Sequence, residues 1–148
     1  MDHFVSGAIE LPSTAAGDSF RRADLVFYGV EHRGDSYTAR VFLDATDGDP
    51  DRSPDRTDGY AGMFTIFGHG GCFGDPGHCR VPETRDPFDS RPPHGLIPQT
   101  KVVDVTDALK AHDGSSVVVT VLAVVPGEDG AKLGDALRFS GLRLLTYR

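Results

Sequence analysis

Histidine and cysteine side chains gather in one short, glycine-rich stretch of this chain. His69, Cys72, His78 and Cys79 fall within eleven residues of the segment GHGGCFGDPGHC. The glycines and Pro76 let the backbone turn tightly, because glycine accepts positive φ angles and proline fixes a turn. Imidazole and thiolate together are typical ligands of zinc and copper. The sequence therefore predicts a site for a copper or zinc ion in this stretch.

The spacing of these residues leaves the ligand set open. It matches no zinc-finger spacing, and the adjacent His78 and Cys79 point apart in an extended chain, so one of them need not bind. His94, in the segment RPPHG, is a replacement ligand. A disulfide between Cys72 and Cys79 is an alternative, and would stabilise the fold by roughly 2 to 3 kcal/mol through loop closure. Free thiols beside ordinary surface histidines are the third alternative.

Chemistry elsewhere in the chain is less concentrated. The sequence has no nucleophile elbow, P-loop, dinucleotide fingerprint or HExxH pattern. His3, His32 and His112 stand alone in sequence, and we assign them no role. An aspartate-rich loop at 44–59 is either a calcium site or a solvated loop, and its spacing does not match an EF-hand. Nothing here requires an enzyme, although a small metalloenzyme with an open coordination position is an alternative.

Composition and charge exclude several classes of partner. The formal net charge of -7 argues against nucleic acid, because phosphate binding needs clustered lysine and arginine. No apolar run approaches the length of about 18 residues that a membrane span requires, and the first residues do not look like a signal peptide. We therefore expect no membrane association and a cytoplasmic location. In that compartment cysteines are usually thiols or metal ligands rather than disulfides.

Short hydrophobic segments separated by turn residues predict the elements that position the candidate ligands. The chain has 148 residues with 18 glycines and 10 prolines, which favours many short elements. Alternation of apolar residues over 36–43 predicts a half-buried strand, and SSVVVTVLAVV is apolar on both faces, as in a central strand. A change of apolar parity at Gly141 predicts a bulge. Strands are expected over 3–11, 24–31, 36–43, 61–67, 100–105, 115–125 and 137–148.

These elements predict one domain over residues 1–148. A short helix is expected over 106–112, capped by Thr106 or Asp107. The fold class is all-β, an antiparallel β-sandwich of about 6–8 strands with long loops and one short helix. The histidine and cysteine stretch belongs to a loop at 68–100, and loops of that length in compact domains are usually functional or disordered.

Several segments, in this order along residues 20–147, resemble the C-terminal β-sandwich domain of bacterial tyrosinase-family (type-3 copper) proteins. They are FRRADLVFYGVE, SYTARVFL, YAGMFTIFGHGGCFGDPGHC, RPPHGLIPQTKVVDVTDAL and GDALRFSGLRLLTY. The cysteine-containing and RPPH segments are the most distinctive. The family is related to the β-sandwich domains that follow the di-copper domain in polyphenol oxidases and hemocyanins. The resemblance implies a type-3 copper protein or domain as a partner.

The resemblance also implies what the chain would do with that partner. Six histidines on a helical bundle hold the copper ions in the family, and the sequence lacks those helices, so it is not a complete tyrosinase. The C-terminal domain in relatives covers the copper site, which makes this chain an accessory domain that shields or loads copper. That role predicts an exposed apolar patch near Met63, Phe64, Phe67 or Phe73. A structural or homo-oligomerising β-sandwich, with its loop pinned by zinc or a disulfide, is the alternative.

Overall fold

The fold is all-β and antiparallel, as the sequence predicts. The computed structural model describes residues 1–11, 20–45, 59–71, 76–77, 79–80, 88, 95–127 and 132–148. The elements in this part of the chain are β1 (His3–Val5), β2 (Ile9–Glu10), β3 (Arg22–Val30), β4 (Tyr37–Leu43), β5 (Tyr60–Ile66), β6 (Gln99–Asp104), α1 (Thr106–Lys110), β7 (Ser116–Val117), β8 (Val119–Val125), β9 (Lys132–Leu133) and β10 (Gly141–Tyr147).

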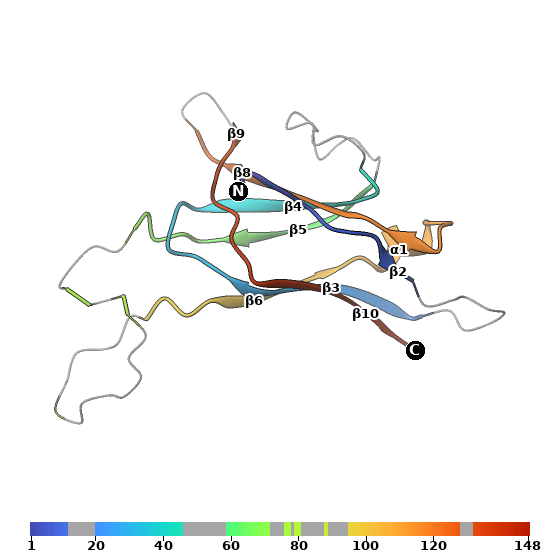
Figure 1. Cartoon of the computed structure of the whole chain (residues 1–148), viewed down its shortest axis with the longest axis horizontal. Helices are drawn as coiled ribbons and strands as arrows, with labels where there is room; N and C mark the ends of the chain where they lie inside the picture. Colours follow the sequence, from blue (N-terminus) through green and yellow to red (C-terminus); the bar gives the residue numbers. More distant parts are fainter. Residues whose placement is uncertain are drawn as a thin grey trace.

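The strands form two main sheets that pack face to face. One sheet has the order β1-β8-β4-β5, with β9 also paired to β8, and the other has the order β10-β3-β6. A small third sheet pairs β2 with β7. Figure 1 shows β4, β5 and β8 lying above β3, β6 and β10, with β5 ending and β6 beginning at the same end. This two-layer packing is the sandwich that buries the apolar side of each sheet.

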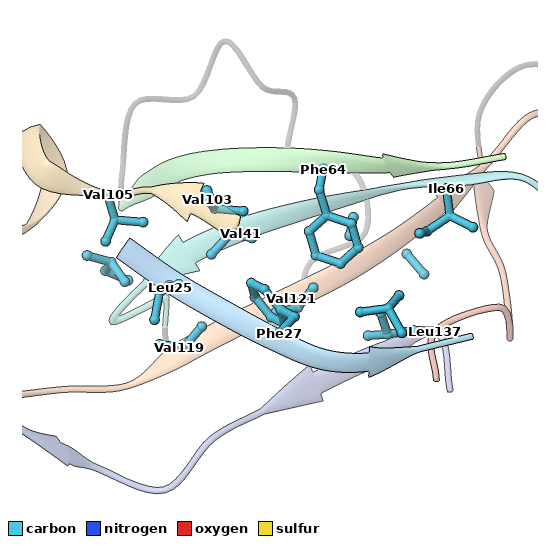
Figure 2. Packing of buried hydrophobic residues seen from close by; sticks show 14 of the residues in the cluster. Leu25, Phe27, Val41, Phe64, Ile66, Val103, Val105, Val119, Val121 and Leu137 are labelled. Carbon is cyan, nitrogen blue, oxygen red and sulfur yellow. The ribbon is translucent and has the colours of Figure 1, made fainter. Parts of the chain in front are cut away.

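The core lies between these two sheets. Side chains of β3, β4, β5 and β8 meet there, and Figure 2 shows Phe27, Phe64 and Val121 converging in the middle. The rings of Phe27 and Phe64 are 4.9 Å apart. Every residue of β8 is buried, and β8 lies between β1 and β4 in its sheet. The expectation of a central strand for this segment is therefore confirmed.

The alternation predicted for 36–43 is also present, with one addition. Tyr37, Ala39, Val41 and Leu43 are all buried on the core side of β4. Phe42, on the opposite side, is buried as well, and its ring packs against Tyr60 at 5.6 Å. A register shift between β4 and β5 occurs at this point. The end of β4 is therefore covered on both faces.

The predicted bulge at Gly141 is wrong. β10 begins at Gly141 and pairs with β3 in unbroken register as far as Tyr147. The apolar parity changes in the sequence because the residues before Gly141 precede the strand rather than belong to it. β3 does contain an irregularity, because its register with β6 shifts between Phe27 and Val30. Gly29 supplies a φ angle of 64° there, a conformation that favours glycine.

The single helix seen in the described residues is shorter than predicted and is not capped as predicted. It is preceded by Val105, without a side-chain capping bond, so the capping role expected of Thr106 or Asp107 is wrong. The Thr106 hydroxyl accepts a hydrogen bond from the Ala23 amide at 2.9 Å and donates one to Asp104 at 2.5 Å. That bond lowers the pKa of Asp104. Within the described ranges no helix is long and apolar enough to cross a membrane.

Candidate functional site

Three connections meet at one end of the sandwich, which we call the loop end. It consists of the β3–β4 turn (31–36), the residues after β5 (67–71) and the residues before β6 (95–98), and it lies on the left in Figure 1. Backbone hydrogen bonds join the first two segments: His69 to His32 at 3.1 Å, Gly70 to Gly34 at 2.8 Å and Gly71 to Arg33 at 2.8 Å. The start of the glycine-rich stretch is therefore fixed to the β3–β4 turn.

Glycine is required at this junction for two separate reasons. Gly70 and Gly71 have φ angles of 61° and 114°, which fits the tight turning expected from the sequence. At Gly68 space is the limit, because an added Cβ would lie 2.3 Å from the Gly34 carbonyl oxygen. The Gly68 amide also donates to the Ser36 hydroxyl at 3.0 Å. These contacts set the direction in which His69 leaves β5.

His69 packs against His32, a residue to which the sequence assigns no role. The two ring centroids are 5.2 Å apart and the ring planes are inclined at 68°. His32 is only 8% exposed, and its Nε2 lies 3.0 Å from the Ile97 carbonyl oxygen. His69 Nδ1 lies 3.3 Å from the His32 carbonyl oxygen. No sequence signal pairs these histidines, because they are brought together by hydrogen bonds between the β3–β4 turn and the residues after β5.

Cys79 is disulfide-bonded. The chain contains two cysteines, and the other is Cys72. A disulfide sulfur is not a thiolate, and only the thiolate is a good metal ligand, so Cys79 in this state favours the disulfide alternative. The Leu96 amide donates to the Cys79 carbonyl oxygen at 3.4 Å, which places Cys79 beside the start of β6.

The other candidate ligands, Cys72, His78 and His94, lie outside the described residues. Among the residues that are described, no three or more His, Cys, Asp or Glu side chains gather as a metal-binding group. The five-residue ligand set therefore stays a prediction. Most of the aspartate-rich loop weighed as a calcium site also lies outside this part of the chain. Its first aspartate, Asp44, makes an ion pair with His112, with 3.0 Å between its Oδ2 and the His112 Nδ1.

Large apolar side chains are exposed at and near the loop end. Phe67 is 83% exposed and Ile97 is 61% exposed. Met63 is exposed on β5, whereas Phe64 is buried in the core. Of the residues expected to form an apolar patch, Met63 and Phe67 are therefore available and Phe64 is not. Phe73 is outside the described residues.

Two hollows lie on the surface of the described residues, and the first of them reaches the loop end at Ser36. A groove of about 650 Å³ runs along the outer side of β4, β5 and β8, between Arg40, Met63 and Pro126. A second hollow, of about 590 Å³, lies beside α1. Arg22 in the second hollow is compensated by Asp24, with 2.8 Å between Nε and the carboxylate. Both volumes fall in the range of small-molecule sites, but volume alone assigns no ligand.

Comparison of the sequence with models of known protein families and with curated proteins returns no match. The function therefore has to be inferred from the residues and from the geometry of the loop end. Three features lie at or beside the loop end: exposed apolar side chains, two packed imidazole rings and the disulfide-bonded Cys79.

Proposed function

We propose that this chain is an accessory β-sandwich domain that docks onto a partner protein through the loop end. The observation that carries the proposal is the exposure of Phe67, which follows β5 directly and precedes residues bonded to the β3–β4 turn. An aromatic side chain held on a fixed backbone makes a strong anchor, because little conformational freedom is lost when it is buried. Ile97 extends the apolar surface offered by the same end.

The proposed partner is a type-3 copper protein or domain. The resemblance of residues 20–147 to the C-terminal domain of tyrosinase-family proteins supports this choice. In such a complex the loop end would cover the partner's copper site and exclude water from it. The chain would then act by shielding or loading copper rather than by carrying out a reaction of its own.

The disulfide at Cys79 supports the form of this proposal in which the loop after β5 is held by a disulfide rather than by a metal ion. Cys79 belongs to the long loop that follows β5, and a disulfide that pins this loop is the structural alternative raised by the sequence. Copper or zinc binding by the predicted set of His69, Cys72, His78, Cys79 and His94 would require reduced cysteines. Disulfides persist mainly in oxidising compartments, so this bond also favours an exported protein over the cytoplasmic location expected from the sequence.

A direct binding measurement tests the docking proposal. The purified chain is titrated into a tyrosinase-family di-copper domain that lacks its own C-terminal domain, and both affinity and phenol oxidation are measured. We expect binding that slows the oxidation, and a loss of affinity of at least about tenfold for Phe67→Ser. Val5→Ser is the matched control, because Val5 is also exposed (54%) but pairs with Thr120 towards the far end of β8.

Two results would contradict docking through the loop end. One is equal affinity for wild type and Phe67→Ser. The other is the absence of any complex with the di-copper domain, while the mass of the chain by itself in sedimentation rises with its concentration. The second result, if abolished by Phe67→Ser, would establish the oligomerising alternative instead.

A further inference from the structure

The two sides of the sandwich differ in how the sheets end. On one side β5 and β6 lie close together, because a Cβ added at Gly62 of β5 would lie 2.6 Å from Val103 Cγ1 of β6. On the other side the larger sheet ends in two short strands, β1 and β9, and the smaller sheet ends in β10. In the described part of the chain β10 pairs with β3 and with no other strand.

The outer edge of β10 carries unpaired backbone groups. β10 pairs with β3 in unbroken register from Gly141 to Tyr147. Every second residue of such an edge strand turns its N–H and C=O away from its neighbour. Within the described residues the backbone of β10 makes one further hydrogen bond, from the Arg21 amide to the Tyr147 carbonyl oxygen at 2.7 Å, and this bond lies on the β3 side. The outward groups are therefore open to a further strand.

β10 also lacks the usual protection of an edge strand. Natural edges are guarded by prolines, bulges or several charges, whereas β10 has no proline, no shift in its register with β3, and one charged residue, Arg143. The Arg143 guanidinium lies over the Tyr28 ring, 5.9 Å from its centroid. Leu142 and Leu144 pack against the core but are only partly buried. The strand thus offers apolar side chains together with free backbone groups.

On the core side, the sequence of β10 fits a second copy of itself. Antiparallel pairing about a two-fold axis at Leu144 brings residues 141–147 of both copies into register along the whole strand. Leu144 then meets Leu144 of the second copy, and Leu142 meets Thr146. The partly exposed leucines at the end of one core would therefore be covered by those of the other.

The outer side of β10 favours the same register. Arg143 lies opposite Leu145 of the second copy, so that no like charges face each other directly. Tyr147 lies opposite Gly141, and an aromatic ring beside a glycine on the neighbouring strand is a stabilising arrangement. A register centred on Arg143 instead would place the two arginines opposite each other and leave Tyr147 without a partner residue.

We propose that the outer edge of β10 pairs with β10 of a second copy of this chain, antiparallel and in the register centred on Leu144. The two three-stranded sheets then form one continuous sheet in the order β6-β3-β10-β10-β3-β6. Main-chain hydrogen bonds supply the affinity, and the side-chain pattern sets the register. Both copies use the same surface, so the contact closes as a dimer. It goes beyond the docking function and does not depend on it, because Phe67 takes no part.

Sedimentation of the full chain over a range of concentrations tests this dimer. We expect wild type to dimerise reversibly, and Leu145→Lys to raise the dissociation constant at least about tenfold, because the introduced lysine faces Arg143 of the second copy. Leu145 is 37% exposed on the outer side of β10, so this variant keeps the core of each chain. Val102→Lys is the matched control, since Val102 is exposed on β6 at the opposite edge of the same sheet. That variant should dimerise as wild type does.

A charge exchange tests the register. Arg143→Glu added to Leu145→Lys should restore the dimer, because each introduced lysine then faces a glutamate of the other copy. Amide hydrogen exchange of wild type should show protection in β10, but not in β6, that increases with protein concentration. A monomer at every concentration, a dimer unaffected by Leu145→Lys, or no recovery in the double variant would overturn the proposal. A dimer retained in Phe67→Ser separates this contact from the loop end, whereas its loss there would also overturn it.

Discussion

At the residue scale, Tyr37 places a polar hydroxyl group in the buried, apolar interior of the domain. It is only 2% exposed, and its hydroxyl has no hydrogen-bond partner among the described residues. Burial raises the pKa of Tyr37 to about 12, because the phenolate would lose its hydration, and the charge of Arg138 opposes this rise only in part. The ring nevertheless packs in the core, 6.5 Å from Phe64. The hydroxyl is therefore a cost that the apolar ring offsets.

Replacing Tyr37 by phenylalanine should not destabilise the domain. The free energy of unfolding should stay the same or rise by up to about 1 kcal/mol, because an unsatisfied buried hydroxyl is removed. Urea denaturation at neutral pH measures this difference. Tyr147→Phe is the control, since Tyr147 is partly exposed on β10. A loss of more than about 1 kcal/mol in Tyr37→Phe would show that the hydroxyl has a partner.

Alkaline pH supplies an independent test of the same residue. The pKa of Tyr37 is raised in the folded state, so the stabilisation from its protonated phenol is complete below pH 10. It is lost as pH rises from the unfolded value of 10.0 through the folded value of about 12, and amounts to on the order of 2 to 3 kcal/mol. Tyr37→Phe should lack this part of the alkaline destabilisation. An identical alkaline profile for both proteins would contradict the assignment.

At the element scale, Asp44 joins the end of β4 to the segment that leads into β8. Its backbone has a φ angle of 51°, and its carboxylate accepts a hydrogen bond from the Val118 amide at 2.8 Å. Its own amide donates to the Val118 carbonyl oxygen at 2.8 Å. The His112 ring lies between Asp44 and the Ser116 carbonyl oxygen, 2.9 Å from the latter. Asp44 is thus a structural link rather than a lone loop carboxylate.

Asp44→Ala and Asp44→Asn should separate the parts of this link. Alanine should lower the free energy of unfolding by about 2 kcal/mol, because it strains the left-handed backbone and leaves the Val118 amide without its acceptor. Asparagine tolerates that backbone and keeps an acceptor oxygen, so it should cost less than about 1 kcal/mol, the usual value of an exposed ion pair. Thermal and urea unfolding measure both variants. Equal losses would mean that only the charge matters.

How far the elements could be predicted depends on how local their causes are. β4 and β8 can be predicted because consecutive residues carry the signal, an alternation of apolar residues in β4 and a continuous apolar run in β8. The bulge predicted at Gly141 is wrong, because a change in the face that carries apolar residues looks the same in the sequence whether a strand bulges or begins. The contact between His32 and His69 could not be predicted, because it follows from hydrogen bonds between the β3–β4 turn and the residues after β5, 37 positions further along the chain. The spacing of the cysteines does not determine whether Cys79 is a thiol or part of a disulfide.

At the scale of the whole molecule, Cys79 is disulfide-bonded within the long connection between β5 and β6. With Cys72 as the other sulfur, the closed loop spans eight residues. A loop of that size restricts the unfolded chain only moderately. The expected gain in stability from the bond is correspondingly moderate.

Cys79→Ser should lower the free energy of unfolding by roughly 2 to 3 kcal/mol under oxidising conditions. Wild type treated with reductant should match the variant, because both lose the same constraint. Urea denaturation with and without reductant measures this effect, and an unchanged midpoint on reduction would contradict it.

The cysteine-containing copper or zinc site is tested by elemental analysis of reduced wild type, Cys72→Ser and His78→Ala. Copper or zinc held only by reduced wild type would support that site.

The pairing of β3 with β10 has a consequence for how the protein is made. Ser140, just before β10, donates to the Tyr28 carbonyl oxygen across 112 residues, and seven successive positions of β10 then align with β3. During synthesis β3 therefore keeps one open edge until β10 has left the ribosomal exit tunnel. A chain that stalls before residue 141 offers a free strand edge to its neighbours.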